Sequence, residues 1–264
     1  MEVDPKQLQI RKLIENYYDI QKIRIEAFNR VVGYVQVNFD KFKHIKTPEE
    51  KKYAYIAELI CKEKIDVPED LEDIVWLFSQ LYSIEKQLYK RIDEFSKDHP
   101  FRMKYLNNII GIGPIFASGI IAWLAPLSRF STVSKLWKYC GLAPGMGMKK
   151  GQQTGYDPTL KSFLIRVGES FLMRKGRGSF YGKLYDKFRA ECEQKHPDWN
   201  KKHVHYWARR KIVKVFLSHA WVMWWRLMEG QEPPTKPYAH AILKHYDYIE
   251  PIMDKLEKAK VKAV

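Results

Sequence analysis

The chain has 264 residues, of which 45% are hydrophobic and 14% aromatic, and it carries 46 Lys and Arg against 31 Asp and Glu, a formal net charge of +15. This composition excludes a disordered, collagen-like or disulfide-stapled chain, and the length allows one large or two modest domains. The three cysteines form no CxxC pair, so neither a structural zinc site nor a disulfide framework is indicated, and a reducing cytoplasm fits.

The excess of positive over negative charge is confined to the C-terminal part of the sequence. Residues 1–100 hold 17 Lys and Arg and 19 Asp and Glu, which leaves 29 and 12 for residues 101–264. Such an asymmetry indicates a polyanionic partner for this part alone. A solvated basic surface without a partner is the alternative.

Residues 1–100 are predicted to form a helical arm. Apolar residues recur every three or four positions from about Pro5 to about Val37, and an apolar seam of nearly heptad period runs from Leu71 to Phe95. Between them, Thr47-Pro48-Glu49-Glu50 has the pattern of a helix start with Thr47 as N-cap. The two seams predict either a hairpin that folds on itself or a coiled-coil arm that forms a homodimer. The acidic residues of this segment are expected on solvated helix faces.

After Pro100 glycines, prolines and aromatic residues become frequent, and we expect a domain boundary there. The uncharged stretch over 105–128 is interrupted by glycines and prolines, so it predicts buried core and no membrane contact. No secretory or transit signal is recognisable at the start. The expected fold is all-α, with an arm over 1–100 and a basic helical domain over 101–264. Further helices are expected over about 101–108, 114–124, 131–139, 159–172, 180–194 and 201–228, with a glycine-rich loop over 145–158.

The stretch Gly111-Ile112-Gly113-Pro114 is the most informative local pattern. Two glycines one residue apart allow a tight turn and a close approach to a ligand, and the following helix start presents free N–H groups that suit a phosphate. The stretch resembles the helix-hairpin-helix motif, in which hairpin amides hold the DNA backbone without reading sequence. A turn that serves only packing is the alternative.

A wider resemblance follows from the surrounding residues. Asn108 to Ser118, then Ser128-Arg129-Phe130 and the run from Leu136 to Pro144 (LWKYCGLAP), resemble in kind and order the C-terminal domain of IS110/IS116/IS902-family transposases. The similarity covers about residues 104–176, and the helix over 203–225 resembles the closing helix of that family more loosely. The resemblance implies a DNA partner. It also implies a possible structured RNA partner, since recombinases of this family can work with a guide RNA.

Two departures from the family bear on catalysis. The family carries an N-terminal RuvC-like domain with four acidic metal ligands, whereas residues 1–100 are helical by pattern and no metal site can be named. The family also uses a serine nucleophile in the loop after GLAP. Here that loop contains no serine, and Thr154 is the one weak catalytic candidate.

We therefore expect a DNA-binding, nucleoid-associated cytoplasmic protein without cofactors or metals and without catalysis of its own. It would grip the phosphate backbone of duplex or branched DNA and form a homodimer through the arm. The alternatives are an active transposase that works with a separate RuvC-like partner, a structured-RNA-binding protein, and a helical adaptor. The residues expected to contact DNA are Gly111, Ile112, Gly113, Pro114, Lys149, Lys150, Arg174, Lys175, Arg177, Arg209, Arg210 and Lys214.

Overall fold

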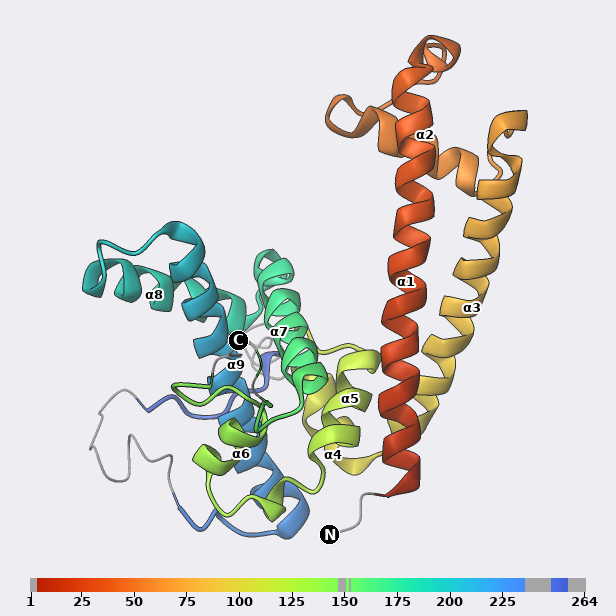
Figure 1. The fold of residues 1–264 in the computed structure, drawn as a ribbon. Helices are drawn as coiled ribbons and strands as arrows, with labels where there is room; N and C mark the ends of the chain where they lie inside the picture. Colours follow the sequence, from red (N-terminus) through yellow and green to blue (C-terminus); the bar gives the residue numbers. More distant parts are fainter. Residues whose placement is uncertain (1–3, 147–150, 152, 236–247, 256–264) are drawn as a thin grey trace, which may run out of the picture. The chain divides into compact units, whose positions relative to one another are not determined.

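The computed structural model describes residues 4–146, 151, 153–235 and 248–255, and within these ranges it contains helices and no strand (Figure 1). The all-α prediction is therefore confirmed for the described part of the chain. Contacts divide the chain into two units, the arm unit Arg11–Ile92 and the hairpin unit formed by Met1–Ile10 with Asp93–Val264. The long helices α1 (Pro5–Val37) and α3 (Glu72–Ser96) contribute residues to both units.

In the arm unit α1 and α3 run antiparallel and side by side (Figure 1). Tyr34 Oη donates to Asp70 Oδ2 at 3.1 Å near one end of the pair, and the Phe28 and Phe78 rings lie 6.1 Å apart farther along. The short helix α2 (Lys52–Cys61) shares the core of these two helices. That core is a cluster of apolar side chains from all three helices and from the 3-10 turn Glu69–Leu71 before α3, and it includes Val31, Val35, Ile56, Ile60, Leu71, Val75 and Phe78.

The buried seam of α3 contains one carboxylate. Leu81 and Ile92 are buried as the pattern predicted, but Ile84 is 42% exposed and Glu85 is only 8% exposed. A strict heptad pattern places residue 85, four positions after Leu81, in the seam. The apolar side chain at position 84 had suggested that residue 84 takes this place. Glu85 pairs with Arg24 and accepts a hydrogen bond from Gln21 Nε2 at 2.9 Å. The expectation that all acidic residues of this segment lie on solvated faces is therefore wrong for Glu85.

The predicted N-cap at Thr47 is also wrong. A 3-10 turn covers Glu49–Lys51 with Pro48 at its cap position, and α2 begins only at Lys52. Pro48 has ψ 132°, an extended conformation, so it does not serve as the first helical residue that the pattern implied.

The hairpin unit contains six further α-helices within the described residues: α4 (Pro100–Lys104), α5 (Pro114–Leu124), α6 (Val133–Tyr139), α7 (Pro158–Met173), α8 (Phe180–Lys195) and α9 (Lys201–Trp224). A π-helical turn, Trp225–Glu229, extends α9. The single helix expected over 101–108 is instead α4 followed by a 3-10 turn, Leu106–Asn108. The other predicted helices agree to within about two residues at most ends. No helix in the described ranges is long and apolar enough to cross a membrane.

The α9 helix forms the centre of this unit and packs against α6, α7 and α8. Phe171 of α7 stands 4.7 Å from Tyr181 of α8 and 5.3 Å from Phe216 of α9, measured between ring centroids. Side-chain oxygens of Asp157, Ser179 and Asn200 cap α7, α8 and α9, respectively. The aromatic cluster holds Phe171 near the C-terminal end of α7, which lies against the turn before α5.

Candidate nucleic-acid interface

Gly111 lies in a tight turn over residues 109–113 that leads into α5, and this turn is called the hairpin below. A hydrogen bond from Ile112 N to Ile109 O, 3.2 Å long, closes the turn, and the Ile112 side chain is buried. Gly111 has φ +110°, and a Cβ atom built on it would lie 2.7 Å from Cδ1 of Phe171. The fold itself therefore requires glycine at position 111.

Gly113 differs from Gly111 both in its backbone conformation and in the space available to a side chain. It is exposed and extended (φ −96°, ψ −179°), and a Cβ atom built on it would meet no heavy atom within 4 Å. It is the N-cap of α5, no side chain caps this helix start, and the first helical residue is Pro114. The first N–H groups of a helix have no acceptor within it, so the start of α5 is open to an external acceptor beside Gly113.

The C-terminal end of α7 brings cations next to this hairpin. Ser170 Oγ donates to the carbonyl oxygen of Gly111 at 2.6 Å, and Phe171 packs on Gly111 as described above. The helix ends at Met173 and is followed by Arg174, Lys175 and Arg177, all exposed, which we call the basic turn. Lys175 forms an ion pair with Asp186 of α8 at 2.6 Å. The structure thus brings together two groups of predicted residues that lie about 60 positions apart.

The hairpin and the basic turn lie within a stretch of sequence that matches a known protein family. Residues 103–178 match the model of the transposase IS116/IS110/IS902 family. The match begins in α4 and ends directly after the basic turn, so this transposase-like segment contains the hairpin, α5, α6 and α7. The resemblance stated from the residues is confirmed over this segment, which is less than a third of the chain. No curated protein matches the chain.

The loop of the transposase-like segment holds the weak catalytic candidate. Thr154 is half-buried and its Oγ1 donates to the carbonyl oxygen of Tyr156 at 2.9 Å. Lys149 and Lys150 lie outside the described residues. Within the described ranges no three His, Cys, Asp or Glu side chains are grouped so that they could hold a metal ion. In the described part of this loop, the candidate hydroxyl of Thr154 is therefore hydrogen-bonded to the backbone.

No pattern in the sequence indicated Asp254, which lies against the hairpin and is 5% exposed. Its carboxylate accepts hydrogen bonds from Ile110 N at 2.8 Å and from Phe180 N at 3.2 Å. It therefore joins the hairpin to the start of α8. The contact spans 144 positions, so no local pattern could have indicated it.

The predicted cations of α9 lie outside the transposase-like segment and differ in their surroundings. Arg209 forms an ion pair with Glu169 of α7, which neutralises much of its charge. Lys214 Nζ lies 4.0 Å from the centroid of the Trp137 ring. Burial, with the nearby positive charges of Arg210 and Lys211, lowers the pKa of Lys214 to about 8. Only Arg210 of these three has neither an ion pair nor a ring partner among the described residues.

Proposed function

We propose that the protein binds DNA through the sugar–phosphate backbone, largely without reading base sequence. The observation that carries the proposal is the geometry at Gly113, where an uncapped helix start lies open beside an exposed basic turn. Backbone N–H groups at a helix start and arginine side chains are both suited to phosphate oxygens. The fold itself would accept a side chain at position 113. The close approach of a ligand gives a reason for glycine at this position.

The charge distribution supports the same partner. Residues 101–264 carry 29 Lys and Arg against 12 Asp and Glu. Each phosphate that such a surface neutralises releases a counterion, which makes binding favourable for any sequence of duplex or branched DNA. A protein with this preference would associate with the nucleoid.

We infer further that the protein performs no strand chemistry of its own. The family's nucleophilic serine has no counterpart in the loop after GLAP, and the Thr154 hydroxyl is hydrogen-bonded to the backbone. A nucleophilic hydroxyl needs a base or a metal to activate it. Metal-dependent nicking by the purified protein would contradict this inference and favour a transposase that works with a RuvC-like partner.

We also propose that the arm unit mediates self-association. Most of the exposed large hydrophobic side chains of the described residues lie in this unit, including Trp76 at 64% and Ile84 at 42% exposed. Burial of such side chains between two copies would be favourable. A dimer would present two hairpin units and could bridge two DNA segments.

Binding of labelled duplex DNA across a salt series tests the DNA proposal. The logarithm of the association constant should fall linearly with the logarithm of salt, with a slope of about −3.6 or steeper if at least four phosphates are neutralised. A duplex of scrambled sequence should compete equally. Affinity that does not depend on salt would contradict the proposal, and stronger competition by a structured RNA of equal length would favour the RNA alternative.

A further inference from the structure

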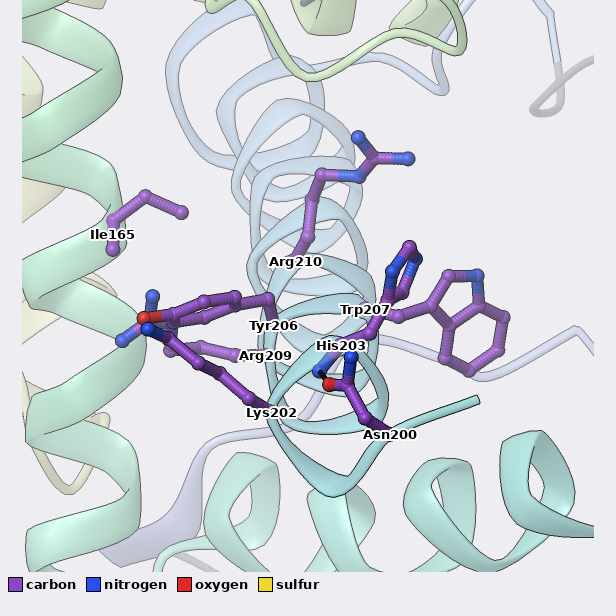
Figure 2. Close-up of a pocket in the computed structure, with 8 residues that line it drawn as sticks. All are labelled: Ile165, Asn200, Lys202, His203, Tyr206, Trp207, Arg209 and Arg210. Carbon is purple, nitrogen blue, oxygen red and sulfur yellow. Dashed lines mark hydrogen bonds between the residues drawn. The ribbon is translucent and has the colours of Figure 1, made fainter. Parts of the chain in front are cut away.

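A cavity of about 610 Å3 lies along the N-terminal half of α9, apart from the hairpin (Figure 2). It is lined by Ile165 of α7 and otherwise by residues of α9 and its N-cap, among them Lys202, His203, Tyr206 and Arg210. The volume lies within the range of about 300–1,000 Å3 that is typical of sites for small ligands. The cavity is therefore large enough for one nucleotide.

Four lining residues of α9 lie within one helix face, because Tyr206, Trp207 and Arg210 come three, four and seven positions after His203. Figure 2 shows Tyr206 pointing toward Ile165, with Lys202 and Arg209 beside it, while His203 and Trp207 point to the opposite side. Aromatic rings thus stand on both sides of this face, with the Arg210 side chain extending apart from both groups.

The rings of the cavity are held in place by their neighbours. Tyr206 is 47% exposed, and the guanidinium of Arg209 lies 4.9 Å from its ring centroid. On the other side, the His203 ring lies 4.1 Å from that of Trp199, which is stacked on His196 at 4.0 Å. An exposed ring held in a fixed orientation is a suitable surface for stacking a base, whatever its identity.

The positive charge around the cavity is only partly neutralised. Arg209 pairs with Glu169, but no carboxylate of the described residues forms an ion pair with Lys202 or Arg210. The first turn of α9 carries Lys201 and Lys202 and no acidic residue. Positive charge at a helix start is unfavourable for the helix itself, so this placement favours an anion as ligand.

We propose that this cavity binds one unpaired nucleotide of a DNA strand. The base lies against the Tyr206 ring, and Lys202 and Arg210 contact the flanking phosphates. The proposal rests on the DNA binding proposed above and adds a preference for DNA with an unpaired base. A regular duplex offers no free base face, so bulged or branched DNA should bind more tightly.

The test compares a regular duplex with the same duplex carrying one extra, unpaired 2-aminopurine nucleotide, both at one salt concentration. The wild-type protein should bind the bulged DNA about fivefold or more tightly and quench the 2-aminopurine fluorescence, as expected for one stacked base. Tyr206→Ala should abolish both effects without changing the affinity for the regular duplex. Tyr206→Phe should retain them, because the ring remains.

The control is Tyr55→Ala, which removes a Tyr of similar exposure, 38%, from α2 of the arm unit. Equal wild-type affinity for the two DNAs would overturn the cavity proposal and leave the proposed function intact. The cavity proposal would also be overturned, and the proposed function left intact, if Tyr206→Ala retained the preference for bulged DNA and had the helical circular dichroism of the wild type. Failure to bind either DNA would overturn both proposals, and tighter binding of an RNA with the same bulge would overturn the assignment to DNA.

Discussion

At the scale of single residues, Gly111 and Gly113 have identical side chains but different roles. The sequence pattern treated them as equivalent members of one motif. The structure separates them because Gly111 has a positive φ and lies against Phe171, whereas Gly113 is extended and has open space around it. Which of the two glycines the fold requires is decided by a contact with a residue far away in the chain. The motif alone does not indicate it.

The first prediction follows from the backbone at Gly111. Gly111→Ala should lower the free energy of unfolding by about 2–4 kcal/mol, because it combines a strained φ with a clash against Phe171. Denaturant unfolding followed by circular dichroism measures this change. The matched control is Gly33→Ala in α1, where a Cβ meets no atom within 4 Å and a small gain in stability is expected. A loss below about 0.5 kcal/mol for Gly111→Ala would contradict this account.

The sequence indicated which residues are positively charged but not which charges are available. Arg209 was expected to contact DNA, yet it pairs with Glu169, which lies 40 positions earlier on a different helix. Lys214 was also expected to contact DNA, yet it is half-buried against Trp137. The residues of the basic turn, in contrast, are exposed. Short-range sequence patterns therefore predict the solvent exposure of a loop better than they predict which residues of other helices contact a given helix face.

At the scale of elements, helical periodicity predicted the long helices well. The expected helix from about Pro5 to about Val37 has those bounds, and α7, α8 and α9 begin within one residue of the expected positions. Glu85 was missed because an apolar residue precedes it in the seam. The carboxylate is buried only because Arg24 and Gln21 of α1 supply its partners.

A pH prediction follows from His219, which links three elements. It accepts a hydrogen bond at Nδ1 from Tyr181 of α8, and its Nε2–H donates to the carbonyl oxygen of Ile249, each at 2.8 Å. Burial lowers the pKa of His219 from 6.5 to about 4. The unfolded chain therefore binds a proton between pH 6.5 and pH 4 while the folded protein does not, and stability falls as the pH falls through this window.

The expected loss from this residue is at most about 3 kcal/mol between pH 6.5 and pH 4. Denaturant unfolding at a series of pH values should show it in the wild type, and His219→Gln should remove that part of the pH dependence. His44→Gln changes an exposed histidine and should leave the curve as it is. Identical pH profiles for the wild type and His219→Gln would refute the buried, neutral state of His219.

At the scale of the whole molecule, the contacts that assemble the hairpin unit were the least predictable. Asp254 joins the hairpin to α8, and Ile249 accepts from His219, although the segment around them has no pattern that indicates either contact. The structure places the hairpin next to the basic turn through α7, and the C-terminal residue Asp254, which no local pattern indicated, holds the hairpin to α8. Long-range polar contacts depend on the fold and not on local spacing.

Self-association of the arm unit is a prediction at the same scale. Sedimentation equilibrium should show a dimer for the wild type, and Trp76→Glu should raise the dimer dissociation constant about tenfold or more, because a charge would be buried at the interface. Met103→Glu, which alters a side chain that is 56% exposed in the hairpin unit, should leave the dimer intact. A monomeric wild-type protein at micromolar concentration would exclude this role of the arm.

The affinity of Gly113→Val for duplex DNA decides whether the start of α5 holds a phosphate. Valine is compatible with the extended backbone at this position and its Cβ has open space around it, so the variant should keep the native fold and lose only about 1 kcal/mol of stability, because valine is a poorer N-cap than glycine. Its branched side chain would keep a phosphate from the start of α5, and duplex affinity should fall about tenfold at equal salt. Gly33→Val, the matched control in α1, should bind as the wild type does. If Gly113→Val binds DNA with wild-type affinity, the hairpin is only a packing turn and the proposed mode of binding is wrong.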